Sequence, residues 1–105
     1  MTDNKIKSRG SESKYEDLPS VDGIWKSKIF DKPINKLRIF SDGSFALPTP
    51  EVEVKISGVE GSFILGVVHD CEIDDHIVDS VQYRLKAGVN GVISISGYRI
   101  EEGDN

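Results

Sequence analysis

The sequence lacks several features that would place it in a particular class of protein. It has one cysteine, Cys71, among 105 residues, so no disulfide can form within the chain. Its longest apolar run, residues 63–68, is far too short to cross a membrane as a helix. Residues 1–20 lack the apolar centre of a secretory signal. We therefore expect a cytoplasmic protein in a reducing environment.

An excess of positive charge is also missing. The chain has 13 basic and 18 acidic residues and a formal net charge of −5, which argues against a general nucleic-acid-binding protein. It contains no glycine-rich phosphate loop and no dinucleotide-binding fingerprint. Hydrophobic residues make up 37% and charged residues 30%, as in soluble globular proteins. A chain of this length favours a single domain.

Short apolar segments separated by turn residues indicate a β protein. Residues 52–56 (VEVKI) and 80–86 (SVQYRLK) alternate between apolar and polar side chains, which is typical of strands with one buried face. Residues 63–68 (FILGVV) predict a strand that is buried on both faces. Asp42-Gly43 and Asn90-Gly91 predict hairpin turns.

These patterns predict an all-β fold, either a small antiparallel β-sandwich or a barrel, with a disordered N-terminal arm. Residues 1–20 are mostly polar and show no apolar period, so we expect a flexible polar arm there. Residues 21–100 are expected to form a single β domain, and residues 101–105 an acidic tail.

The stretch HDCEIDDHIVDS, residues 69–80, concentrates groups that bind metals. On a strand, His69 and Cys71 share a face, and with His76 they would supply three ligands of a zinc site. The chain has no second cysteine-containing pair, and its aspartates do not follow the order of an EF-hand loop. We therefore expect no metal and no cofactor.

Cys71 is also a poor candidate for a catalytic nucleophile. A reactive thiol requires a lowered pKa, whereas the carboxylates around Cys71 would raise it. A domain of this size also leaves little room for a substrate cleft. We expect a protein that is not an enzyme and has no catalytic residues.

Residues 25–38, WKSKIFDKPINKLR, contain five basic residues with Trp25 and Phe30 among them. Single-stranded nucleic acids are bound by this combination, through charge neutralisation and stacking. Lysines on an edge strand, however, also prevent unwanted sheet pairing. If this region forms a nucleic-acid site, its residues are Trp25, Lys26, Lys28, Phe30 and Arg38.

Residues 54–100 carry a further pattern, in which GSFILGVV is followed by a polar insert, then VQYRLK and NGVISIS. This order resembles the β-subdomain of the substrate-binding part of the seventy-kilodalton heat-shock chaperones. The resemblance implies a β-sandwich that binds an extended polypeptide. The same segment looks loosely like a small Sm-like barrel.

The leading functional hypothesis is a non-enzymatic β module that binds a protein or an extended peptide of basic character. Binding would use a sheet edge and an acidic loop whose contact residues are Asp70, Glu72, Asp74 and Asp75. One alternative is a small nucleic-acid-binding barrel. Another is a structural subunit of a phage or other oligomeric assembly, in which sheet edges pair between chains. No membrane partner is expected.

Overall fold

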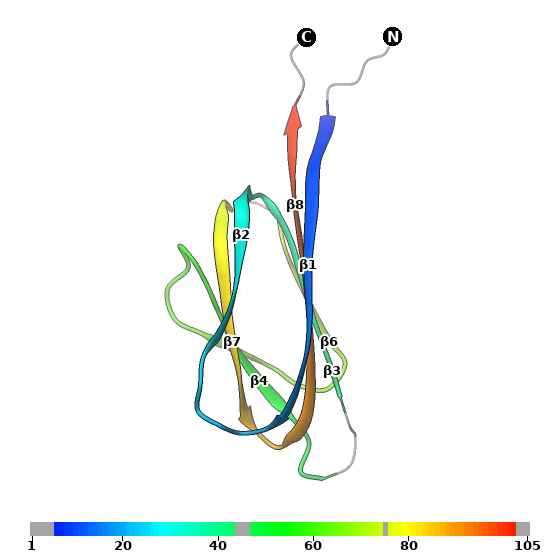
Figure 1. The fold of residues 1–105 in the computed structure, drawn as a ribbon, viewed down its shortest axis with the longest axis vertical. Helices are drawn as coiled ribbons and strands as arrows, with labels where there is room; N and C mark the ends of the chain where they lie inside the picture. Colours follow the sequence, from blue (N-terminus) through cyan, green and yellow to red (C-terminus); the bar gives the residue numbers. More distant parts are fainter. Residues whose placement is uncertain (1–5, 44–46, 75, 103–105) are drawn as a thin grey trace.

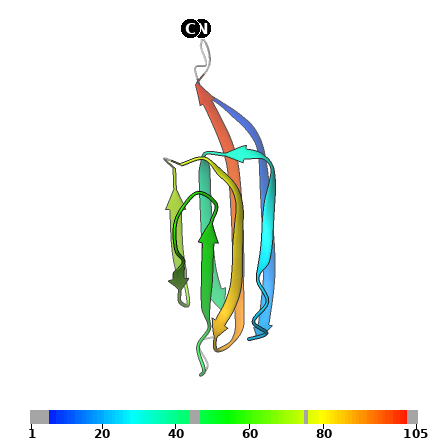
Figure 2. The same cartoon turned by 90° about the vertical axis from the view of Figure 1, so that its left-hand side faces the viewer.

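The fold is a sandwich of two four-stranded antiparallel sheets (Figures 1 and 2). The structure is a computed structural model, and it describes residues 6–43, 47–74 and 76–102. For residues 6–10 and 101–102 only the backbone is described. Sheet A has the strand order β1-β8-β3-β6, and sheet B the order β2-β7-β4-β5. The predicted all-β antiparallel sandwich is confirmed. The strands are β1 (Ile6–Ser20), β2 (Lys26–Ile34), β3 (Lys36–Gly43), β4 (Glu51–Ile56), β5 (Phe63–Leu65), β6 (His69–Ile73), β7 (Val78–Ala87) and β8 (Val89–Glu102).

The core lies between the two sheets and is built by alternating side chains. In β4, Val52, Val54 and Ile56 are buried as their spacing predicts, because every second residue of a strand points to the same face. Each such side chain contributes about 1.5 to 3 kcal/mol when it leaves water. The other apolar core residues are Leu18, Phe30, Ile34, Leu37, Ile39, Leu65, Val78, Val81, Tyr83, Leu85, Ile93 and Ile95.

Residues 63–68 do not form the single doubly buried strand that their composition predicts. Strand β5 ends at Leu65 and is an edge of sheet B, whereas β6 begins at His69 and is an edge of sheet A. Val68, between them, has a positive φ of 54° and is 54% exposed. The apolar run therefore includes the turn by which the chain crosses from one sheet to the other.

The hairpin turn predicted at Asn90-Gly91 is wrong. Strands β7 and β8 belong to different sheets, and the chain turns between them at Gly88, which has a φ of 82°. Asn90 lies within β8 at a φ of 57°, and Gly91 pairs with Gly43 at the end of β3. Strand β3 runs through Asp42-Gly43, where a hairpin turn is predicted, and residues 44–46 lie outside the described residues.

The expected flexible arm is instead mostly strand. Residues 6–20 form β1, which pairs with β8 from the Ile6–Glu102 contact to the Ser20–Val89 contact. The folded domain therefore extends beyond the expected range of 21–100. Residues 1–5 of the expected arm and residues 103–105 of the expected tail lie outside the described residues.

The ends of β1 and β8 continue beyond the sandwich as a two-stranded ribbon (Figure 1). Strand β3 pairs with β8 only as far as Tyr98, so residues 99–102 of β8 pair with residues 6–9 of β1 alone. A register shift between Arg9 and Ser11 separates this β1–β8 ribbon, residues 6–9 and 99–102, from the rest of sheet A.

Candidate functional site

The outer face of sheet A brings the acidic stretch and the basic segment together. Strand β6 pairs with β3, and the register places Arg38 opposite Glu72 and next to Asp70. Arg38 donates three charge-assisted hydrogen bonds to Asp70, from Nε to Oδ1 at 3.0 Å and to Oδ2 at 3.2 Å, and from Nη2 to Oδ2 at 2.7 Å. This pairing lowers the pKa of Asp70 and raises the pKa of Arg38, chiefly through the hydrogen bonds between them.

The remaining predicted contact residues are held more loosely. Glu72 Oε2 lies 4.0 Å from Arg38 Nε, and Asp74 Oδ2 lies 3.9 Å from Lys36 Nζ. The Glu72 and Asp74 side chains stay 71% and 66% exposed, compared with 41% for Asp70. Asp75 lies outside the described residues. Glu72 and Asp74 are therefore the acidic groups of β6 and its end that remain most accessible to a partner.

Two shallow open grooves lie beside these ion pairs, because β8 presents the short side chains Ser94 and Ser96 between longer neighbours. One groove is lined by Arg38, Phe40, Ser94 and Ser96. The other is lined by Lys36, Leu37, Arg38, Glu72, Ile73, Asp74, Ser96, Tyr98 and Ile100. The outer face of sheet A thus combines polar and apolar side chains and is only gently hollowed, which suits contact with another surface better than enclosure of a small ligand.

The candidate nucleic-acid residues are not brought into one platform. The Phe30 ring is buried at 5% exposure, and Arg38 lies on the outer face of sheet A. Trp25 belongs to the sheet B side, where the Nζ of Lys55 lies 4.5 Å and the guanidinium of Arg84 4.4 Å from its ring. The Trp25 ring is therefore already in contact with two cationic side chains of the same chain.

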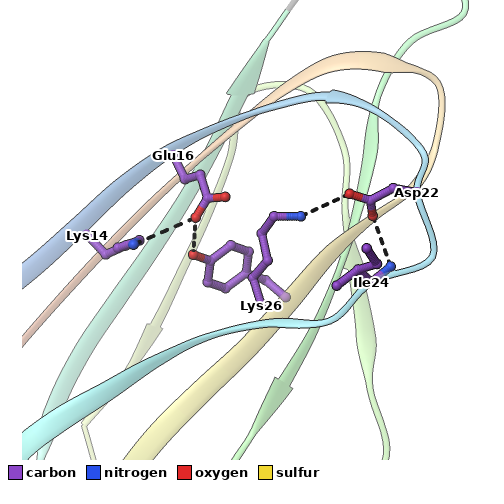
Figure 3. Close-up of polar contacts among 6 residues, drawn as sticks. Lys14, Glu16, Asp22, Ile24 and Lys26 are labelled. Atoms are coloured by element: carbon purple, nitrogen blue, oxygen red, sulfur yellow. Dashed lines mark hydrogen bonds and ion pairs between the residues drawn. The ribbon is translucent and has the colours of Figure 1, made fainter.

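Strands β1 and β2, the edge strands of the two sheets, are joined by contacts of Glu12. Lys28 Nζ lies 2.9 Å from Glu12 Oε1, and the Asp31 N–H donates to Glu12 Oε2 at 2.8 Å. The hydrogen bond from Lys28 is the main cause of the lowered pKa of Glu12. Lys26 pairs with Asp22 at 3.2 Å (Figure 3). The two Glu12 contacts join the sheets at this edge, whereas the Lys26–Asp22 pair links β2 to the loop that precedes it.

A buried tyrosine extends the same contact. Tyr83 of β7 is fully buried and donates its hydroxyl to Glu16 Oε1 at 2.5 Å, and Lys14 lies 3.9 Å from the same oxygen (Figure 3). Burial, followed by the nearby Glu16, raises the pKa of Tyr83. The sequence places Tyr83 on the apolar face of its strand, but its partner is 67 residues away in a segment expected to be flexible.

The three candidate metal ligands are directed to different environments. Cys71 packs against the core, whereas His69 at the start of β6 is exposed. His76 Nε2 lies 3.3 Å from the carbonyl oxygen of Ser57, beside Gly58. Within the described parts of the chain, no group of three histidine, cysteine or acidic residues is placed to hold a metal ion.

The environment of Cys71 predicts an unreactive thiol. Burial is the largest cause of its raised pKa, and Asp70 and Glu72 raise it further, in the direction that the sequence indicates. We expect iodoacetamide to alkylate Cys71 in the folded protein at mildly alkaline pH about tenfold more slowly than in the urea-unfolded chain. N-Acetylcysteine with and without urea controls for the solvent. Equal rates in the folded and unfolded chains would contradict the placement of Cys71.

Comparisons with known proteins identify the fold but no family. No protein-family model and no curated protein matches the chain. The fold is similar to that of a chain in a solved structure of Bacillus endospore appendages, which are described as a novel family of disulfide-linked pili. The TM-score is 0.51 and the sequence identity 7%, over 98% of this chain and 93% of that one. In the part of the chain that is described, no helix is long and apolar enough to cross a membrane.

Proposed function

We propose that the chain is a structural subunit that assembles with further copies of itself through the edges of its sheets. The observation that carries this proposal is the β1–β8 ribbon, which continues beyond the sandwich without a third strand among the described residues. A two-stranded ribbon is at best marginally stable in water, and an open strand edge is a template for pairing with another chain. An assembled neighbour would stabilise the ribbon.

The two edges of the ribbon differ. On the β8 side, Ile100 N–H donates to Asn35 Oδ1 at 2.8 Å, and Asn35 Nδ2 donates to the Ile100 carbonyl at 2.7 Å. The Asn35 side chain therefore takes the place of a strand there. Because these peptide groups point away from β1, Ile100 and its partner Ser8 form a non-hydrogen-bonded pair, and Ser8 directs its own N–H and C=O to the open edge of β1.

The fold similarity supports the same proposal. The similar chain comes from pili, and pili are assemblies of many chains. Pairing of sheet edges between subunits is a common way to build such assemblies, since each new strand gains main-chain hydrogen bonds.

The test is the mass of the full chain in solution, measured by light scattering and sedimentation velocity over a wide concentration range. We expect wild-type protein to form oligomers as concentration rises. Ser8→Pro removes the outward N–H and should weaken association about tenfold, because it removes one intermolecular hydrogen bond worth ~1 kcal/mol and adds a bulky ring.

Ser8→Ala is the matched control, because it keeps the N–H and should associate like wild type. Circular dichroism and urea unfolding establish that both variants remain folded. A wild-type chain that stays monomeric at every concentration would contradict the proposed function. Equal association of the two variants would show that the open edge of β1 takes no part.

A further inference from the structure

We propose that the open β1 edge of the ribbon in one copy pairs with the β6 edge of the next copy, so that their A sheets become one continuous sheet. This inference rests on the proposed function and specifies its interface. The partner is a second copy of the same chain. The contact is head-to-tail, because two different strands of the subunit meet in it.

The strand order of sheet A provides the first argument. Strands β1 and β6 are the two opposite edges of this sheet, so each copy offers both halves of the contact without overlap between them. A contact of this kind leaves one β1 edge and one β6 edge free at the ends of every assembly. It therefore repeats, and it gives an open filament or, where the rotation closes, a ring.

The other edges of the sandwich are less suited to this contact. Strand β5 has three residues, which allows few hydrogen bonds. Strand β2 contains Pro33 and a register shift between Ile29 and Ile34, and Glu12 already accepts the Asp31 N–H. Strand β6 has five residues, pairs with β3 without a register shift, and has no second strand partner among the described residues. It is the longest regular edge that remains.

Charge complementarity supports pairing of these two edges. By sequence, the β1 part of the ribbon, residues 6–9, carries Lys7 and Arg9 and no acidic residue. Strand β6 and the residue after it carry Asp70, Glu72 and Asp74. Glu72 and Asp74 are largely exposed and lie 3.9 to 4.0 Å from the basic groups of their own copy, so they can turn to a neighbour at little cost.

The charges on β8 do not cancel this complementarity. Arg99 in the β8 half of the ribbon is accompanied by Glu101 and Glu102. With Lys7 and Arg9, the ribbon has three basic and two acidic residues by sequence, which leaves one net positive charge. Opposite charges across an interface set its orientation and speed association, so we expect assembly to weaken as salt rises.

The experiment exchanges the charges of the two edges in the full chain. The first variant, Lys7→Glu with Arg9→Glu, makes the ribbon edge acidic, and the second, Glu72→Lys with Asp74→Lys, makes the β6 edge basic. Each variant alone brings like charges together and should associate at least about tenfold more weakly than wild type at low salt. An equimolar mixture should recover association, because every contact in an alternating assembly then joins opposite charges.

A disulfide trap identifies the residues in contact. Ser8→Cys with Cys71→Ser is mixed with Glu72→Cys with Cys71→Ser under mild oxidation. We expect a disulfide between the two different variants, and little between identical ones. Cross-links only between Ser8→Cys copies, or a charge-exchanged mixture that stays as weak as its components, would overturn the β1–β6 pairing. If the β1–β6 pairing is overturned but wild-type protein still forms oligomers in the same buffer, the proposed function stands. A wild-type chain that stays monomeric would contradict both the proposed function and the β1–β6 pairing.

Discussion

Gly88→Ala should destabilise the protein by about 3 to 5 kcal/mol, a large part of the stability of a domain this size. Gly88 turns the chain from β7 to β8 at a φ of 82°, a conformation that costs an L-residue about 1 to 2 kcal/mol. A Cβ there would also overlap the carbonyl of Thr49 and lie 2.7 Å from the Cα of Pro50. Both neighbours are backbone, so no side-chain rotation relieves the overlap.

Gly61→Ala is the matched control, since Gly61 has the same φ of 82° and a Cβ there would have no neighbour within 4 Å. It should lose only the conformational part, about 1 to 2 kcal/mol. Urea unfolding of wild type and both variants measures the difference. If the two variants lost equal stability, the close approach of residues 49–50 to the β7–β8 corner would be contradicted.

Tyr83→Phe should remove the part of the stability loss at alkaline pH that comes from this tyrosine. The raised pKa of Tyr83 means that the unfolded chain releases this proton near its ordinary value while the folded chain retains it. The contribution of Tyr83 to the free energy of unfolding is therefore fully present below about pH 10. Above that pH it falls by ~1.4 kcal/mol per pH unit. At neutral pH the variant should lose ~1 kcal/mol, because the hydrogen bond to Glu16 is removed.

The measurement is the free energy of unfolding at several pH values on both sides of ~10. Tyr98→Phe is the control, since the Tyr98 side chain is 38% exposed on the outer face of sheet A and the alkaline slope should remain. Deprotonation of lysines adds a pH dependence common to all three proteins, and subtraction of the Tyr83→Phe curve isolates the tyrosine. An unchanged slope in Tyr83→Phe would contradict the burial of its hydroxyl.

Strands in which apolar and polar residues alternate could be predicted from the sequence. Strands with polar residues on the face directed at the other sheet could not. In β4, apolar residues alternate with charged ones because one side of the strand packs on the core, and the apolar residues are Val52, Val54 and Ile56. Strand β1 escaped prediction because Glu12 and Glu16 point at sheet B and bind Lys28 and Tyr83 there. No apolar period can reveal a strand whose inward side chains are satisfied by ion pairs and hydrogen bonds.

The candidate site shows the same limit. The sequence distinguishes an acidic stretch from a basic segment, but it does not reveal that Arg38 and Asp70, 32 residues apart, pair across adjacent strands. That contact depends on the order of strands in sheet A, which is set by packing between distant segments. The burial of Phe30 also involves a distant segment, since its ring lies beside Gly97 of β8 in the opposite sheet.

The pairing of β1 with β8 also determines when this molecule can fold. The first and last described strands lie side by side, so the longest ladder of sheet A joins segments separated by almost the whole chain. On the ribosome β1 has no strand with which to form its ladder until residues 89–102 have emerged, and its backbone groups stay unpaired until then. Loops of this length close slowly and delay folding. Newly made chains therefore pass through a period in which β1 can pair with another molecule before it pairs with β8.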